Sequence, residues 1–412
     1  MQSFLIGIFG DTMVPYLLMA VLPLVFILLF ALVAILGELK VSAFMQHRVG
    51  PMEAGPYGIL QPLADIIKLI QKEALRPSGA DRWLYQIAPF LVFIGSFAAF
   101  AVVPFSPFYI AADLDVGVFY LIAVSALVVI GIFMAGWASN NKYTLFGGVR
   151  SVAQIISYEI PAGFVILGVV MMAGTLSMQG IIEQQGGGFW NWYLFGGPKE
   201  MVVTSPLTGA PVQVGGTWLS IILLPLMALA ALVYYVCGLA ETNRVPFDLP
   251  EAESELVSGY NTEYSSMKYA IFYLAEYANM FVVCAVAVTL FLGGWLSPFP
   301  RFVVEYLGVG SRLWIGIEGL FWFVAKSFAL VLAQILLRWT LPRLRVDQLM
   351  HLCWKVFLPV GFAMVLIVGA WITFVAPPLP PKAPAVQAIP AAADSSASLP
   401  GVPDSAAGAT RK

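Results

Sequence analysis

The chain has 412 residues, of which 60% are hydrophobic and only 11% are charged, and its formal net charge is −2. Soluble globular chains are about one quarter charged, so this composition excludes a water-soluble fold. The sequence also has no basic block, which argues against nucleic acid as a partner.

Apolar runs long enough to cross about 30 Å of hydrocarbon as a helix recur along the chain. They predict an all-α polytopic membrane protein whose transmembrane domain covers residues 1–376. No Lys or Arg occurs between Met1 and Gly37, so the basic start of a cleavable signal peptide is missing and the first span should remain. The eight spans are expected at 14–36, 83–104, 116–138, 151–173, 217–240, 270–294, 313–338 and 353–375.

The orientation follows from the connectors, because Lys and Arg are enriched in cytoplasmic loops. One set of connectors holds most of the basic residues, and we expect that set to be cytoplasmic and both termini to lie outside. Residues 377–412 are rich in Pro, Ala and Ser and are predicted to be disordered. The basic residues on the expected cytoplasmic side are Lys40, Arg48, Lys68, Lys72, Arg76, Arg82, Lys142, Arg150, Arg244, Lys268, Arg338, Arg343 and Arg345.

Between the first two spans, the pattern predicts a short cytoplasmic amphipathic helix in the membrane interface. Asp65 and Lys68 lie off its apolar face, at a spacing that also suits an ordinary ion pair. A helix that merely rests on lipid headgroups would show the same pattern. The apolar face is formed by Leu63, Ile66, Ile67 and Ile70.

The connector after the fifth span is acidic, which reverses the usual basic bias of a cytoplasmic loop. Carboxylates that crowd together near low-dielectric surroundings cannot all ionise cheaply, so such a segment can hold and pass protons. The alternative is a solvated acidic loop that binds a basic partner. Against the single cation Arg244, the acids are Glu241, Asp248, Glu251, Glu253, Glu255 and Glu263.

Two further carboxylates, Glu159 and Glu276, fall inside apolar spans near their cytoplasmic ends. An ionised side chain in hydrocarbon costs about 2.5–3.5 kcal/mol on insertion scales, so both are candidates for a function inside the helix bundle. Glu318 and Lys326 in the seventh span are weaker candidates, because they are two turns apart and cannot pair directly.

The sequence predicts neither a metal site nor a redox cofactor in this chain. Cys237, Cys284 and Cys353 are far apart and lack the spacing of an iron–sulfur or zinc site. His47 and His351 are two isolated imidazoles, which make a poor pair of axial ligands for a buried haem.

Three blocks carry a resemblance to a known family. Residues 58–73 fit the pattern G-x-x-Q-x-x-x-D-x-x-K-x-x-x-K-E, and residues 241–259 fit E-T-N-R-x-P-F-D-x-x-E-x-E-S-E-L-x-S-G. Residues 342–350 read PRLRVDQLM. Together they resemble the H-type membrane subunit of respiratory NADH:quinone oxidoreductase, complex I, over nearly the whole chain.

The resemblance implies a multi-pass subunit of a proton-translocating enzyme in the bacterial inner membrane. Such a subunit forms the quinone-binding tunnel and links quinone reduction to the proton path of the membrane arm. It has no catalytic residue or redox cofactor of its own. Partner subunits of the quinone module in the peripheral arm would bind NADH, flavin and the iron–sulfur clusters. Further subunits would complete the membrane arm. Lipid quinone would be the substrate.

The family pattern also assigns roles to residues of this sequence. It implies that Arg48, Gln61, Asp65 and Phe247 line or border the quinone path. It makes Arg244 the counter-ion that orders the acidic loop. The acids that it places on the proton path are Glu159, Glu241, Asp248, Glu251, Glu253, Glu255, Glu263 and Glu276.

Three other interpretations remain open at this point. The related membrane subunit of energy-converting, hydrogenase-type complexes has the same fold, although the intact segment 241–263 favours the quinone type. An independent ion or solute transporter would use the acids to bind its cargo. An assembly scaffold would carry the acids without any chemical role.

Overall fold

The computed structural model describes residues 13–197, 201–204, 211–214, 218–250, 253–299 and 312–374. All of them belong to one unit, Met1–Pro377. The tail predicted to be disordered, 377–412, lies outside the described residues.

Within these described residues, eight helical spans are long and apolar enough to cross a membrane, which confirms the predicted fold class. Seven are single helices: α2 (Met13–Met45), α4 (Arg82–Ala99), α5 (Gly117–Ala138), α6 (Lys142–Ala173), α8 (Leu224–Glu241), α10 (Ser266–Phe291) and α12 (Arg312–Thr340). The eighth joins α13 (Val346–His351), a π-helical turn (Leu352–Phe357) and α14 (Leu358–Phe374).

The connectors between the spans hold short elements. The short helices are α3 (Gln61–Gln71), α7 (Met178–Gln184) and α9 (Glu253–Leu256). Single 3₁₀ turns lie at Pro56–Gly58, Phe189–Asn191, Tyr193–Phe195, Trp218–Leu223 and Gly259–Asn261. Strands β1 (Met201–Thr204) and β2 (Pro211–Val214) form an antiparallel hairpin with Met201 opposite Val214. The sequence pattern did not predict this hairpin, which is confined to one connector.

Several helices extend beyond the apolar runs that predicted them. The first was expected to end at 36 but continues to Met45, and the fourth was expected from 151 but begins at Lys142. Hydropathy detects only the part of a helix that suits hydrocarbon, whereas capping decides where the helix begins. Asp81 accepts hydrogen bonds from the backbone of Trp83 and Leu84 at the start of α4, and Asn141 caps α6 in the same way.

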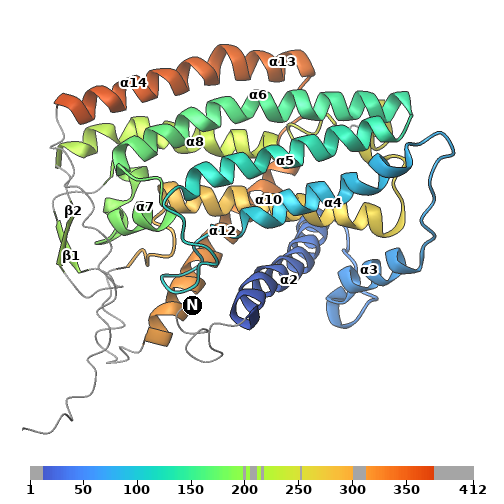
Figure 1. The fold of residues 1–412 in the computed structure, drawn as a ribbon, viewed down its shortest axis with the longest axis horizontal. Helices are drawn as coiled ribbons and strands as arrows, with labels where there is room; N and C mark the ends of the chain where they lie inside the picture. The colour runs from blue at the N-terminus through green and yellow to red at the C-terminus, as the bar shows by residue number, and fades with distance from the viewer. Residues whose placement is uncertain are drawn as a thin grey trace, which may run out of the picture. The chain divides into compact units, whose positions relative to one another are not determined.

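Helix α10 lies at the centre of the bundle. Of its apolar window, 72% is buried, which is the largest share among the eight spans. It packs against α2, α4, α8 and α12, while α6 packs against α5, α8 and α14. In Figure 1, α4, α5, α6, α8, α10 and α14 run in one general direction, whereas α2 and α12 are steeply inclined to them. The bundle thus places α5, α6 and α8 around one side of α10.

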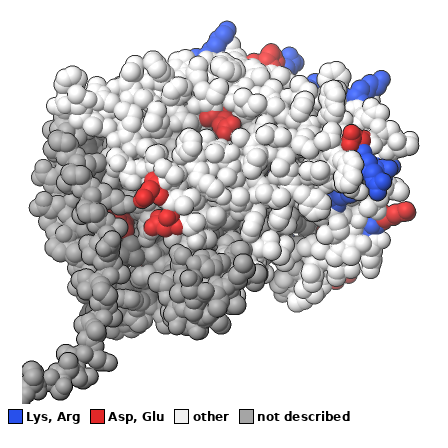
Figure 2. Space-filling model, in the orientation of Figure 1, with Lys and Arg blue, Asp and Glu red and all other residues white. Residues whose placement is uncertain are grey.

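The predicted amphipathic helix is α3, which contacts α2 and α10. Its apolar residues Leu63, Ile67 and Ile70 are exposed, as suits a helix that lies in a membrane interface. Figure 2 shows Lys and Arg side chains at one end and along the upper edge of the view, and the area between is mostly uncharged apart from a few Asp and Glu side chains. Such an uncharged area is what a surface in contact with hydrocarbon requires.

Candidate functional site

The acid-rich segment begins at the last residue of α8, Glu241, and is held in place by Gln154 on α6. The Gln154 side-chain nitrogen lies 2.8 Å from the Ala240 carbonyl oxygen and 2.9 Å from the Phe247 carbonyl oxygen. It also lies 3.2 Å from the Asn243 side-chain oxygen. Gln154 is buried, so one amide ties the exit of α8 and the following loop to the middle of the bundle.

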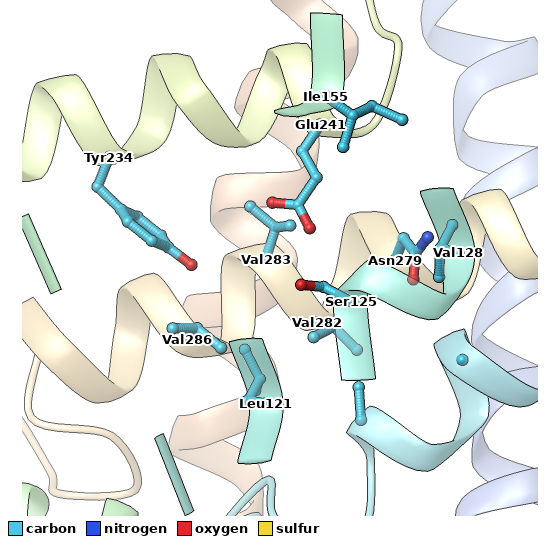
Figure 3. A pocket seen from close by; sticks show the side chains of 12 residues that line it. Leu121, Ser125, Val128, Ile155, Tyr234, Glu241, Asn279, Val282, Val283 and Val286 are labelled. Carbon is cyan, nitrogen blue, oxygen red and sulfur yellow. The ribbon is translucent and has the colours of Figure 1, made fainter. Parts of the chain in front are cut away.

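Glu241 faces a cavity of about 40 Å³ inside the bundle. Apolar side chains of α4, α5, α6 and α10 form most of the wall, and the polar lining consists of Ser125, Tyr234, Glu241 and Asn279. Figure 3 shows the Glu241 carboxylate, the Ser125 hydroxyl and the Tyr234 phenol directed toward this shared space. The Ser125 hydroxyl also lies 3.1 Å from Oε1 of Glu159, to which it donates a hydrogen bond.

The other described acids of the loop do not form one crowded cluster. Arg150 binds Glu255 at 2.7 Å, and Arg343 binds Asp248 at 3.2 Å. The Asn141 amide donates to Glu263 at 2.7 Å. These acids therefore have different partners on different elements. Glu251 lies outside the described residues, and so does the side chain of Glu253.

An ionic cluster around the buried side chain of Glu38, the Glu38 cluster, joins four segments that are far apart in the sequence. We define it as Glu38 on α2, Arg244 after α8, Tyr277 on α10 and Arg338 on α12. Arg244 Nη1 lies 3.2 Å from both Glu38 oxygens, and the Tyr277 hydroxyl donates to Glu38 at 2.5 Å. Arg338 also forms an ion pair with Glu38. The predicted counter-ion of the acidic loop thus binds an acid outside that loop.

Arg244 remains charged in this cluster. Burial by itself lowers the pKa of a guanidinium, but neighbouring Tyr277 and Glu276 outweigh burial and raise the pKa of Arg244 above its ordinary value. The guanidinium also lies 4.8 Å from the centre of the Tyr277 ring, a cation–π contact. Glu276 is therefore close enough to Arg244 to raise its pKa, and it is a second acid beside the Glu38 cluster.

The residues predicted to border the quinone path fall into two places. Gln61 and Asp65 lie together on α3, where the Gln61 amide is 3.4 Å from both Asp65 oxygens and Lys68 binds Asp65 at 2.8 Å. Arg48 is exposed just after α2 and donates to Gln46 at 2.6 Å. Phe247 is buried in the core, edge-on to the Tyr158 ring at 5.3 Å.

Comparison with known proteins supports the same family as the sequence motifs. The NADH dehydrogenase family model matches residues 18–369. The chain is 50% identical over 358 residues to the NADH-quinone oxidoreductase H subunit of Chlorobaculum tepidum, a match that covers 86% of this chain and 92% of that protein. The chain belongs to the NADH-quinone oxidoreductase H-subunit family.

Other relatives in the H-subunit family agree over similar lengths. The protein of Chlorobium luteolum is 51% identical over 362 residues, covering 87% of this chain and 90% of that protein. The protein of Phenylobacterium zucineum is 43% identical over 352 residues, covering 85% and 91%. This chain is accordingly a membrane subunit of NADH-quinone oxidoreductase.

In this NADH-quinone oxidoreductase subunit, the structure reveals polar side chains that the sequence reasoning did not single out. These side chains are Glu38, Gln154 and Ser125. Glu38 could have been found as an acid in a helix that extends past its apolar run. Gln154 and Ser125 are uncharged and carry no local signal of their long-range partners.

Lys326 on α12 has a definite structural role. Its ammonium donates to the carbonyl oxygens of Leu292 at 2.7 Å, Gly294 at 3.0 Å and Leu296 at 2.6 Å. It also lies 4.3 Å from the ring centre of Trp192. All of its hydrogen-bond donors are thus directed at the chain that follows the end of α10.

Within the part of the chain that the structure describes, no three His, Cys, Asp or Glu side chains are grouped so that they could hold a metal ion. The free thiols of Cys237, Cys284 and Cys353 are buried at separate positions.

Proposed function

We propose that this chain forms the wall of the quinone tunnel and carries protons from the site of quinone reduction into the membrane arm. The observation that supports this proposal most strongly is that one internal cavity links two acids from different helices. Glu241 ends α8 and faces the cavity, and Ser125 on the cavity wall binds Glu159 of α6. Reduction of a quinone by two electrons requires two protons, and these acids can supply or replace them.

The proposal includes the orientation and the partners. We propose that the end of the bundle with α3 and the acid-rich loop faces the cytoplasm of a bacterium, with both termini outside. There the chain would contact quinone-module subunits of the peripheral arm, and other membrane-arm subunits would pack along its helices. NADH oxidation, flavin and iron–sulfur clusters would belong to those partners, while lipid quinone would enter along this chain.

Replacement of Glu241 by Gln tests the proton path. The amide has nearly the shape of the carboxyl group but cannot take up and release a proton, so we expect at least a tenfold loss of proton pumping and of quinone reduction in the assembled enzyme. Both rates are measured in membrane vesicles, with NADH oxidation by a soluble artificial acceptor as the check on electron input.

Glu53→Gln is the matched control, because Glu53 is an exposed acid in the first connector and belongs to neither the proposed proton path nor the proposed quinone path. It should retain most of the wild-type rate. Normal pumping by assembled Glu241→Gln enzyme would refute the proton path. Ion transport by the purified chain alone in liposomes would instead favour an independent transporter.

The quinone side of the proposal is tested at Asp65. In Asp65→Asn the partners Lys68 and Gln61 lose their charged acceptor, so the local polar arrangement on α3 changes. We expect a several-fold increase in KM for a short-chain quinone with a smaller change in kcat, measured on the assembled enzyme. Glu73→Gln removes the same charge from an exposed site beyond the end of α3 and should leave KM unchanged. An unchanged KM in Asp65→Asn would remove Asp65 from the quinone path.

A further inference from the structure

Glu159 reaches the cavity through Ser125. The cavity is lined by Glu241 from α8 and by Ser125 from α5, and Glu159 on α6 accepts a hydrogen bond from that same Ser125. Ser125 thus lines the cavity together with one acid, Glu241, and is hydrogen-bonded to a second acid, Glu159, that lies within a membrane span. Figure 3 shows the Ser125 hydroxyl directed into the space that Glu241 faces, and the same hydroxyl donates to the Glu159 carboxylate.

The cavity has the size and the polarity that internal water needs. A water molecule requires roughly 10–15 Å³ of such space and two to four polar partners. The cavity provides about 40 Å³, with a carboxylate, a serine hydroxyl, a tyrosine hydroxyl and an asparagine amide in its wall. Water in this space can accept a proton from Glu241 and donate to the Ser125 oxygen.

The Ser125 hydroxyl has two alternative acceptors for its one proton. Oγ lies 2.7 Å from the carbonyl oxygen of Ile122 and 3.1 Å from Oε1 of Glu159. When Glu159 is ionised, the hydroxyl can donate to it. When Glu159 is protonated, it can donate to Oγ while the hydroxyl turns to the Ile122 carbonyl. A serine that only bonds back to its own helix would have the first of these acceptors alone.

We propose that Ser125 is a proton relay residue that, together with water in the cavity, connects Glu241 to Glu159. This inference rests on the proposed proton path and specifies one step of it. Glu241 gives a proton to cavity water, water gives a proton to Ser125 Oγ, and the original hydroxyl proton passes to Glu159. One O–H bond breaks and one forms at the water oxygen and at Ser125 Oγ, so the net change is that Glu241 loses a proton and Glu159 gains one, and Ser125 is regenerated.

A pair of variants of equal shape tests the relay. Ser125→Thr retains the hydroxyl, whereas Ser125→Val has almost the same shape as Thr without it. We expect Thr to pump protons within twofold of the wild-type rate and Val to pump at least fivefold more slowly, with equal electron input to the artificial acceptor.

Ser96→Ala is the matched control. Ser96 is buried on α4 and bonds back to the Val92 carbonyl at 3.0 Å, and it is not among the residues that line the cavity. Its loss should leave pumping within twofold of wild type. If Val disturbs assembly, Ser125→Ala serves as the smaller change and should still pump at least threefold more slowly.

The outcomes separate the relay from the wider proton path. Equal rates in Thr and Val, or an unchanged rate in Ala, would overturn the relay while the loss in Glu241→Gln still supported the path. A slow Val variant beside a normal Glu241→Gln variant would also overturn the relay, since no proton from Glu241 would then be needed. A loss in Val and in Glu241→Gln, with Thr normal, is the result that supports it.

Discussion

Replacing Glu38 with Gln should destabilise the membrane domain by about 3–5 kcal/mol, the usual effect of removing one partner from a buried ion pair. Glu38 is only 9% exposed and is the shared partner of Arg244 and Arg338. The amide keeps the shape but removes the charge, which leaves two guanidinium groups close together. The expected result is less assembled enzyme and a lower thermal inactivation temperature of the purified enzyme.

Two further variants show whether the loss comes from the charge cluster. Glu53→Gln removes one acid from an exposed site in the first connector and should have little effect. Adding Arg338→Gln to Glu38→Gln removes one of the uncompensated cations, so the double variant should be more stable than the sum of the two single losses predicts. A Glu38→Gln enzyme as stable as wild type would show that Glu276 alone balances Arg244.

Sequence reasoning succeeded where the membrane itself imposes the pattern. Every helix that crosses hydrocarbon needs about 20 apolar residues, so the existence of eight spans could be predicted from the sequence alone. The short helix α3 was also predictable, because its apolar residues repeat with the helical period. The C-terminal end of α2 and the start of α6 were not, since both lie outside the apolar runs, and at the start of α6 the helix is capped by Asn141.

The site was harder to predict because its contacts join distant parts of the chain. Glu38 is separated by 206 residues from Arg244 and by 300 residues from Arg338, so no local spacing indicates the cluster. The acidic loop suggested crowded carboxylates, yet Glu255 and Asp248 each bind a separate arginine. Motif resemblance found the loop itself, whereas the pairing of its members depends on how α6 and α12 pack beside it.

Lys326 was a weak candidate in the sequence because Glu318 is too distant to pair with it. Its partners are backbone carbonyls near the end of α10, where a helix leaves its last carbonyl groups without intrahelical donors. A cation at that end is also favoured by the helix dipole. One ammonium therefore anchors α12 to the chain that leaves α10.

Lys326→Met should consequently destabilise the membrane domain by about 3 kcal/mol. The variant loses three hydrogen bonds from a charged group, which contribute about 1.5–3 kcal/mol each. Part of that loss is offset, because the variant no longer has to bury a charge. The measurement is the thermal inactivation temperature of the purified enzyme. Lys326→Arg keeps the charge and the contact with the Trp192 ring, but its planar donors cannot converge on all three carbonyls, so an intermediate loss is expected.

Lys72→Met is the control at an exposed position. Equal stability of Lys326→Met and wild type would mean that the desolvation of the ammonium cancels its three hydrogen bonds, and that packing alone joins α12 to the end of α10.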